Sequence, residues 1–318
     1  MASEGIIGLD LGGTFLKYAL GTPEGELLYK SKKPSHGKES RDVIFNVIFQ
    51  AIDECLAQAS KQKIEVAAVG CGTPGAVDFD RGKLRGNTPN LADWGNADIR
   101  TRIVKRYNLP TWVDNDANVM TLAESHCGAA AGYKTVIALT LGTGIGGGIM
   151  IDSQIYRGTH YAGAELGHIT IQHDGRQCNC GGRGCIEQYA SAPAMVRHYM
   201  EKTASATQVA DTTINTEIIF ARAAQGETAA IKTIDETCAY LGAALASIVN
   251  IFNPEIIVIG GGVAEAGEDF LGKIYNELKS RAMEPALRDL KLVPATLGND
   301  AGMVGAIILA ATMNSKDR

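Results

Sequence analysis

Residues 162–189 read AGAELGHITIQHDGRQCNCGGRGCIEQY and hold three of the seven cysteines of the chain. The three thiols, at Cys178, Cys180 and Cys185, follow a C-x-C-x4-C spacing with glycines between the second and the third. Glycines allow the backbone to turn tightly enough for three thiolates to converge on one ion, and a histidine nitrogen completes a tetrahedral Cys3His set. We therefore interpret this stretch as a zinc-binding loop.

Two other interpretations compete with the zinc loop: a disulfide, and a group of free buried thiols. Cysteines separated by one residue would close a strained disulfide ring, and an odd number of cysteines with no visible secretory signal argues against a secreted disulfide framework. Spacing alone does not choose between His168 and His173 as the nitrogen ligand. A closed four-ligand site has no open position for catalysis, so the metal is expected to be structural.

Two carboxylates, Glu165 and Glu187, bracket the loop. Paired carboxylates with the imidazole of His168 between them are natural acceptors for several hydroxyl groups of one small polyol. Most glutamates are instead solvated surface charges, and the spacing does not exclude that alternative. The choice depends on the rest of the chain.

Length, composition and charge narrow the class of protein. A length of 318 residues exceeds one compact core of ordinary size and predicts two domains. Hydrophobic residues make up 45% and charged residues 20%, which are globular values. A net charge of −5 and a pI near 5.7 give no electrostatic footprint for nucleic acid or an acidic membrane. Because no secretory signal is visible and the longest apolar run, residues 301–313, is too short to span a bilayer, we expect a cytoplasmic protein.

Strands and helices alternate along the chain, which is the pattern of an α/β protein. Both halves share one unit, in which a strand, a turn of glycine and threonine, a second strand, another turn and a third strand follow each other. This weak internal repeat predicts two duplicated domains that face a cleft. Strands are expected at 6–10, 15–20, 26–33, 66–72, 111–114, 135–141, 149–152, 154–157, 256–259 and 291–296, and helices after Ser40 and Asn118 and at 98–107, 192–202, 215–225, 227–252 and 301–313.

The glycine-rich turn in each half is suited to bind phosphate. Without side chains, the glycines expose backbone N–H groups to an anion, the threonine hydroxyl adds a donor and a nearby lysine adds charge, so two hairpins could hold one polyphosphate from opposite sides. An aspartate at the first strand end suits Mg²⁺ held through water. The alternative is that both clusters are only tight hairpin turns. The residues concerned are Asp10, Gly12, Gly13, Thr14 and Lys17 in the first half and Gly142, Thr143 and Gly144 in the second.

Other nucleotide-binding motifs are missing or out of place in the sequence. The chain contains no GxxxxGK[ST], which excludes a P-loop enzyme. Residues 142–147 satisfy the dinucleotide pattern formally, but a strand rather than a helix is expected after them. The glycines at 260–262 have Glu265 where the third glycine of that pattern belongs. A Rossmann oxidoreductase is therefore not expected.

A set of motifs in the same order resembles that of the ROK family of sugar kinases, and the resemblance covers essentially the whole chain. The segment EQYASA at residues 187–192 looks more like the glucokinases than like other members. The motifs are DLGGT at 10–14, GTPG at 72–75, NDAN at 115–118, LGTGIGGG at 141–148, AGAELGH at 162–168 with CNCGGRGC at 178–185, and IGGG at 259–262.

The resemblance implies an actin/hexokinase-like fold, also called ribonuclease H-like, in which two duplicated α/β domains enclose a cleft for ATP. Residues 1–117, completed by a C-terminal helix at 300–318, would form the small domain, and residues 118–299 would form the large domain with the zinc loop. It also implies an ATP-dependent hexose kinase that phosphorylates the 6-hydroxyl of glucose, and a homodimer or homotetramer. N-acetylglucosamine or mannose as the sugar, and polyphosphate as the donor, are the open alternatives.

The same resemblance implies the residues of each site. The sugar would bind at Gly75, Asn90, Asn115, Asp116, Glu165, His168 and Glu187. Structural Zn²⁺ would be held by His168, Cys178, Cys180 and Cys185, so the choice of His168 over His173 comes from the resemblance. ATP with Mg²⁺ would bind at Asp10, Gly12, Gly13, Thr14, Lys17, Gly142, Thr143 and Gly144, with Gly261 and Gly262 beside the adenosine.

Asp116 is the expected catalytic base. Phosphoryl transfer needs a group that takes the proton of the sugar hydroxyl, and a strand end can aim such a group. Its competing role is that of an N-cap for the following helix, and the family match favours the base.

The competing class of protein is a sugar-sensing ROK repressor, which carries a helix-turn-helix segment ahead of the DLGGT strand. Few residues precede that strand here, and the acidic chain offers no basic helix, so DNA binding is not expected.

Overall fold

The computed structural model describes residues 3–86, 88, 91–203, 213–263 and 267–316. Contacts within the chain divide it into two compact units. The first comprises residues 1–132, 154–164 and 296–318, and the second comprises residues 133–153 and 165–295. The expected boundary at residue 117 falls inside helix α3 (Asp116–Cys127), which the contacts assign to the first unit because α3 packs against the C-terminal helix α9 (Ala301–Lys316).

The first unit is built on a five-stranded sheet in the order β3-β2-β1-β4-β7. Its first three strands form an antiparallel meander, and β4 and β7 continue the sheet parallel to β1. The expected strands are present, with β1 extended at both ends relative to the sequence pattern. The bounds are β1 (Ser3–Leu11), β2 (Phe15–Gly21), β3 (Leu27–Pro34), β4 (Ile64–Thr73) and β7 (Thr111–Asn115), with the small hairpin β5 (Val77–Asp78) and β6 (Lys83–Leu84) beside them.

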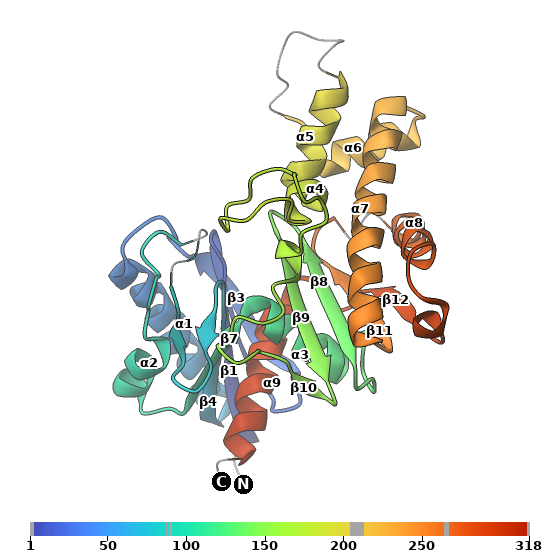
Figure 1. Cartoon of the computed structure of the whole chain (residues 1–318). Coiled ribbons are helices and arrows are strands. Elements are labelled where there is room, and N and C mark those ends of the chain that lie inside the picture. The colour runs from blue at the N-terminus through green and yellow to red at the C-terminus, as the bar shows by residue number, and fades with distance from the viewer. Residues whose placement is uncertain (1–2, 87, 89–90, 204–212, 264–266, 317–318) are drawn as a thin grey trace. The chain divides into compact units, whose positions relative to one another are not determined.

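Helices cover both faces of this sheet (Figure 1). Alternate residues of β1 point to opposite faces, and Ile7 and Leu9 join a core with helices α1 (Arg41–Gln62) and α2 (Ile99–Tyr107). Ile6 packs on the other side in a core that includes residues of α3 and α9. Because both faces are buried, β1 reads as a continuous apolar run rather than an alternating one.

Glycines allow α9 to lie unusually close to its neighbours. A Cβ added at Gly70 on β4 would stand 1.7 Å from the carbonyl oxygen of Ala306, and one added at Gly305 would stand 1.8 Å from that of Val119 on α3. Any larger residue at either position would push the helix away from the sheet or from α3. The first unit therefore depends on a helix that comes from the far end of the chain.

The second unit contains the strands β9-β8-β11-β12 in that order, and the short β10 (Gln154–Ile155) is counted with the first unit. β8 pairs antiparallel with β9 and parallel with β11, just as β1 pairs with β2 and β4, so the same strand arrangement recurs in both units. The strand bounds are β8 (Val136–Leu141), β9 (Ile145–Ile151), β11 (Ile256–Gly260) and β12 (Lys291–Pro294).

The helices of the second unit include one that was not predicted from the sequence. Helix α8 (Glu268–Lys279) packs against the long helix α7 (Thr228–Phe252) (Figure 1) and buries Phe270, Leu271 and Ile274, a helical spacing that could have predicted it. The others are η1 (Leu166–His168), α4 (Glu187–Ala190), α5 (Ala192–Thr203), α6 (Thr216–Ala224) and η3 (Glu284–Leu287), while η4 (Gly298–Asp300) precedes α9 in the first unit.

None of the helices within the described ranges is both long enough and apolar enough to cross a membrane.

Candidate functional site

The turn between β1 and β2 presents backbone at the surface of the first unit. The Gly12 N–H donates to the carbonyl oxygen of Phe15 at 2.9 Å and closes the turn, while Gly13 and Thr14 are exposed. The carbonyl oxygen of Thr14 accepts from the Ser35 N–H at 2.9 Å, which fixes the orientation of its peptide. The predicted phosphate-binding turn is thus an ordered hairpin with exposed backbone groups at its tip.

Asp10 and Lys17 stand opposite each other at the base of this hairpin. The Lys17 Nζ lies 3.8 Å from the Asp10 carboxylate and also donates to the carbonyl oxygen of Asn299 at 3.2 Å. Burial raises the pKa of Asp10, and the charge of Lys17 offsets part of that rise. A Cβ added at Gly302 would stand 2.4 Å from the Asp10 carboxyl carbon, so this carboxylate lies against the first turn of α9. The N–H groups at the start of a helix favour a negative charge.

The junction of β7 and α3 carries the predicted base. Asn115 is the N-cap of α3, because its Oδ1 accepts from the N–H groups of Ala117 at 2.8 Å and Asn118 at 3.3 Å. The competing prediction that Asp116 serves as the N-cap is therefore wrong; Asp116 is the first residue of the helix itself. The Asn115 Nδ2 donates to the carbonyl oxygen of Gly75 at 3.2 Å, so the structure brings three of the predicted sugar residues together. Asn90 lies outside the described residues.

The second glycine-rich turn, between β8 and β9, is bound to Glu187. The Gly142 N–H donates to the carbonyl oxygen of Gly144 at 3.0 Å, and the Ile145 N–H donates to the Glu187 Oε2 at 2.9 Å. A Cβ added at Gly144 would stand 2.5 Å from that same oxygen, so a larger residue there would displace the Glu187 carboxylate. A Cβ added at Gly142 would meet nothing within 4 Å. Packing therefore explains the glycine at 144 but not the one at 142.

Gly261 and Gly262 follow β11 in the second unit. Gly261 has a φ of +87°, and a Cβ there would stand 2.4 Å from the carbonyl oxygen of Leu141, so its glycine is required by the local fold. A Cβ added at Gly262 would meet nothing within 4 Å. The structure thus places Gly261 next to the end of β8, the strand that leads into the second glycine-rich turn.

His168 and Glu187 lie close enough to Glu165 to influence its carboxylate. Glu165 is exposed, yet the protein around it removes enough hydration to raise its pKa; the charge of His168 lowers that pKa and the charge of Glu187 raises it. An antiparallel bridge between Thr170 and Cys185 holds the segments together. Its two hydrogen bonds run from the Ile186 N–H to the carbonyl oxygen of Ile169 and from the Ile171 N–H to that of Gly184, both at 2.9 Å. The two carboxylates and the imidazole of the prediction therefore form one local group.

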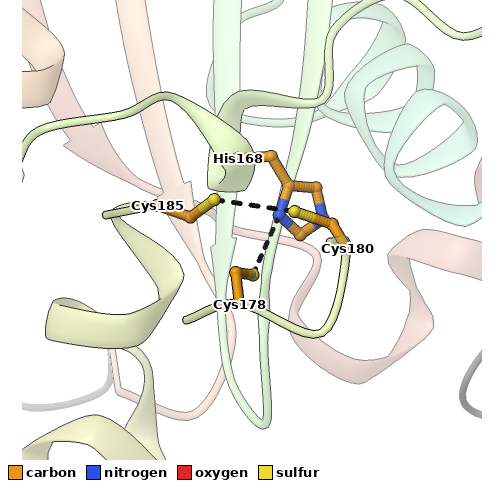
Figure 2. A group of neighbouring side chains, drawn as sticks. All are labelled: His168, Cys178, Cys180 and Cys185. Atoms are coloured by element: carbon orange, nitrogen blue, oxygen red, sulfur yellow. Dashed lines mark hydrogen bonds between the residues drawn. The ribbon is translucent and has the colours of Figure 1, made fainter. Parts of the chain in front are cut away.

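The side chains of His168, Cys178, Cys180 and Cys185 point toward one another (Figure 2), and one ligand atom from each lies within 4.8 Å of the others. The Cys180 and Cys185 sulfurs are 3.6 Å apart, and the Cys178 sulfur lies 3.7 Å from the His168 Nδ1. A tetrahedral ion bonded at about 2.3 Å to sulfur and about 2.05 Å to nitrogen would set these separations at about 3.8 Å and 3.6 Å. These two separations are therefore close to those of a tetrahedral metal site.

Backbone geometry and hydrogen bonds support this cluster. A Cβ added at Gly184, with a φ of +69°, would stand 1.7 Å from the carbonyl oxygen of Gln172. The Gly182 N–H donates to the Cys180 sulfur at 3.4 Å and lowers the pKa of that thiol, whereas burial raises the pKa of Cys185 to about 12. His173 is not part of the cluster: its side chain is 87% exposed and pairs with the neighbouring Asp174.

Sequence reasoning missed two groups that contact a predicted residue or its direct neighbour in the chain. Gln188, next to Glu187 in the chain, donates from Nε2 to the Cys178 sulfur at 3.7 Å. Arg157 binds Asp114, which directly precedes Asn115. Gln188 could have been suspected from its place in EQYASA, but the Arg157 pair spans 43 residues and has no local sequence signal.

Two α/β units with the same strand arrangement, each with a glycine-rich hairpin between its first two strands, define an actin/hexokinase-like fold. The chain belongs to the ROK family, whose model matches residues 6–313. It is 36% identical to a glucokinase of Thermotoga maritima over 315 residues, which is 95% of either chain.

Solved structures agree with this assignment. A ROK family glucokinase from Streptomyces griseus, in complex with glucose and AMPPNP, is 32% identical with a TM-score of 0.82, over 97% of this chain and 99% of that one. A ROK family transcriptional regulator, a homologue of the E. coli MLC protein, is 29% identical with a TM-score of 0.88, over 99% of this chain and 79% of that one.

Proposed function

We propose that this chain is an ATP-dependent glucokinase, which transfers the terminal phosphoryl group of ATP to the 6-hydroxyl of glucose. The observation that carries the proposal is the β7–α3 junction, where Asn115 is the N-cap and Asp116 is the first helical residue, with its Oδ1 beside the Ala117 N–H at 3.0 Å. The similarity to glucokinases over nearly the full chain supports the same reading.

The two glycine-rich hairpins are the proposed phosphate sites. Backbone N–H groups can bind the oxygens of a polyphosphate without a charged side chain. Such groups are exposed at Gly13 and Thr14, and the space beside Gly142 is open. The carboxylate of Asp10 is a hard oxygen donor of the kind that Mg²⁺ binds through water, and Lys17 is held beside it. Mg²⁺, when bound with ATP, neutralises charge on the phosphate oxygens.

Asp116 is proposed as the general base. As the phosphoryl group transfers, the sugar hydroxyl loses its proton, and a carboxylate at the start of a helix can accept that proton without rearrangement. The sugar would be positioned by hydrogen bonds to the polar groups of the remaining predicted residues. These are Gly75, Asn90 and Asn115 together with Glu165, His168 and Glu187.

The four-residue cluster is proposed as a structural Zn²⁺ site with His168, Cys178, Cys180 and Cys185 as ligands. Its donor set and separations fit tetrahedral zinc and leave no ligand position open for a substrate. Zinc, when bound, would cross-link the loop that begins at Glu165 and ends at Glu187. Both proposed sugar carboxylates would thereby be fixed by one ion.

A coupled assay for ADP formation, run over glucose, N-acetylglucosamine, mannose and other hexoses, tests the function. We expect the highest kcat/KM with glucose and ATP. Replacing ATP by polyphosphate tests which phosphoryl donor is used. A titration with operator-length DNA tests the alternative function as a repressor, which the similarity to a transcriptional regulator suggests. Specific DNA binding without turnover of any hexose would overturn the kinase proposal.

A further inference from the structure

A buried ion pair lies next to the proposed base and is not part of the proposed chemistry. The Nε and Nη2 of Arg157 donate to the same oxygen of Asp114, Oδ2, at 2.8 and 2.6 Å. The Asp114 side chain is 3% exposed and that of Arg157 is 20% exposed. Desolvated pairs of this kind hold their geometry strongly, because breaking them leaves a buried charge without a partner.

The other oxygen of Asp114 holds the start of α3. Its Oδ1 accepts from the Asn115 N–H at 2.8 Å and from the Asn118 Nδ2 at 2.9 Å. One carboxylate thus binds the residue before Asp116 and a residue in the first turn after it. Any rotation of this carboxylate would move both contacts, and with them the backbone that carries Asp116.

Arg157 is itself fixed from three sides. Its guanidinium lies over the ring of Phe79, 3.8 Å from the ring centre, and its Nη1 donates to the carbonyl oxygen of Ile155 at 3.3 Å. Its own carbonyl oxygen accepts from the Gly163 N–H at 2.8 Å. Residues 154–164 therefore form a tethered segment, and this segment runs directly into Glu165.

We infer that Arg157 is a positioning residue for phosphoryl transfer: through Asp114 it sets the orientation of Asp116, and it ties the segment before Glu165 to the same carboxylate. The inference rests on the proposed function of Asp116 as the base. A lysine would keep the charge of Arg157 but present a single ammonium group in place of the planar fork, and it would not stack on Phe79 in the same way. Asp114 would then rotate, and a displacement of a catalytic group near 1 Å costs about a hundredfold in rate.

Arg157→Lys is the main test, with Arg102→Lys as its matched control. Arg102 also belongs to the first unit, also donates to an aspartate, Asp42, at 2.7 Å, and also lies over an aromatic ring, that of Phe45 at 4.4 Å. We expect Arg157→Lys to lower kcat with glucose by about 10- to 100-fold, with ATP affinity, measured with a fluorescent analogue, unchanged within about twofold. Arg102→Lys should leave kcat unchanged.

Two further measurements separate positioning from a purely structural role. In the Asp116→Asn background, Arg157→Lys should have no additional effect on the residual rate, since residues that act through one another are not additive. Millimolar methylguanidinium should restore part of the kcat of Arg157→Ala. The inference alone would be overturned if the wild-type enzyme phosphorylates glucose and Arg157→Lys keeps its full kcat. The same holds if Arg157→Lys loses ATP affinity in parallel with kcat. A wild-type protein that phosphorylates no hexose would overturn the proposed function as well.

Discussion

At the scale of single residues, Asn115 and Asp116 divide two roles that the sequence alone left open for Asp116. Asn115 supplies the cap of α3 with its side-chain oxygen and contacts Gly75 with its nitrogen, so one amide orders two segments. Asp116 then begins the helix, and its own carboxylate accepts from the Ala117 N–H at 3.0 Å. This division of roles follows from where β7 ends: Asn115 is the last residue of the strand and therefore stands directly before the helix.

Asp116→Asn is expected to abolish glucose phosphorylation and leave glucose binding largely intact. The amide keeps the shape of the side chain but cannot take up the hydroxyl proton, and loss of a general base costs about 10²- to 10⁴-fold in rate. Steady-state kinetics together with glucose binding by calorimetry check this. Turnover near the wild-type rate would leave Asp116 with no role in proton transfer.

Asp10→Asn is expected to lower kcat sharply while raising the thermal stability of the ligand-free protein. Burial raises the pKa of Asp10, so keeping it ionised costs folding free energy at neutral pH. That cost is present above the raised pKa of the folded state and disappears below the unfolded value of about 3.9. The Tm of the variant should exceed that of wild type by about 1–5 °C at pH 7, and the two should converge as the pH falls toward 4. A variant less stable than wild type at pH 7 would contradict this reading.

At the scale of elements, the loop from Glu165 to Glu187 is held by its own backbone and by its four clustered side chains rather than by long secondary structure. Short contacts between residues 169–171 and 184–186 bring the two ends together. The Glu187 carboxylate then reaches the N–H of Ile145 at the edge of the glycine-rich turn. Within the second unit, the loop thereby connects Glu165, His168 and Glu187 to the proposed phosphate hairpin.

Cys180→Ser is expected to remove zinc and to weaken sugar binding much more than ATP binding. Without the metal both ends of the loop are released, and misplacement of Glu165 and Glu187 near 1 Å can cost about a hundredfold in rate. Elemental analysis should find about one zinc per wild-type chain. Cys127→Ser is the matched control, because that residue is exposed, lies outside the cluster and donates to the backbone of its own helix at Ala123. A metal-free wild-type protein with full glucose affinity would reduce the cysteines to packing residues.

At the scale of the whole molecule, Glu124 marks where the chain passes between its two units. Its side chain is fully buried and accepts from the N–H groups of Ala129, Thr296 and Leu297 at 2.8, 3.0 and 2.9 Å. Ala129 lies just before the chain leaves the first unit at Gly132, and Thr296 is where the chain returns to it. One carboxylate thus fixes, inside the first unit, the ends of two connecting segments.

Glu124→Gln is expected to lower the free energy of unfolding by about 2–4 kcal/mol, because the amide turns a donor toward backbone donors that need an acceptor. Urea denaturation checks this. Glu255→Gln is the control: Glu255 accepts from the N–H groups of Lys134 and Thr135 in the same way, but it is exposed, so its loss should cost at most about 1 kcal/mol. Equal losses in the two variants would show that burial does not set the cost at Glu124.

Local pattern was enough for most of the strands and for the clustering of cysteines, because a strand, a tight turn and a metal loop depend on residues that are close in sequence. DLGGT and LGTG each predict a hairpin, and C-x-C-x4-C brings three sulfurs within a few residues of one another. The family resemblance added the choice of His168, which the structure places in the cluster while His173 points to solvent.

Tertiary structure alone decided which distant residues share a partner. Helix α9 joins the first unit because Gly70 and Gly305 admit it against β4 and α3, and no local pattern reveals that approach. The pairing of Arg157 with Asp114, the contact of Glu187 with Ile145 and the amides of Thr296 and Leu297 on Glu124 each join segments tens to hundreds of residues apart. The type of side chain sets what such a group can bind, but only the packed chain brings a buried carboxylate and its donors to the same point. The physical reason is that a buried polar group loses its hydration and must find a partner within the protein to compensate.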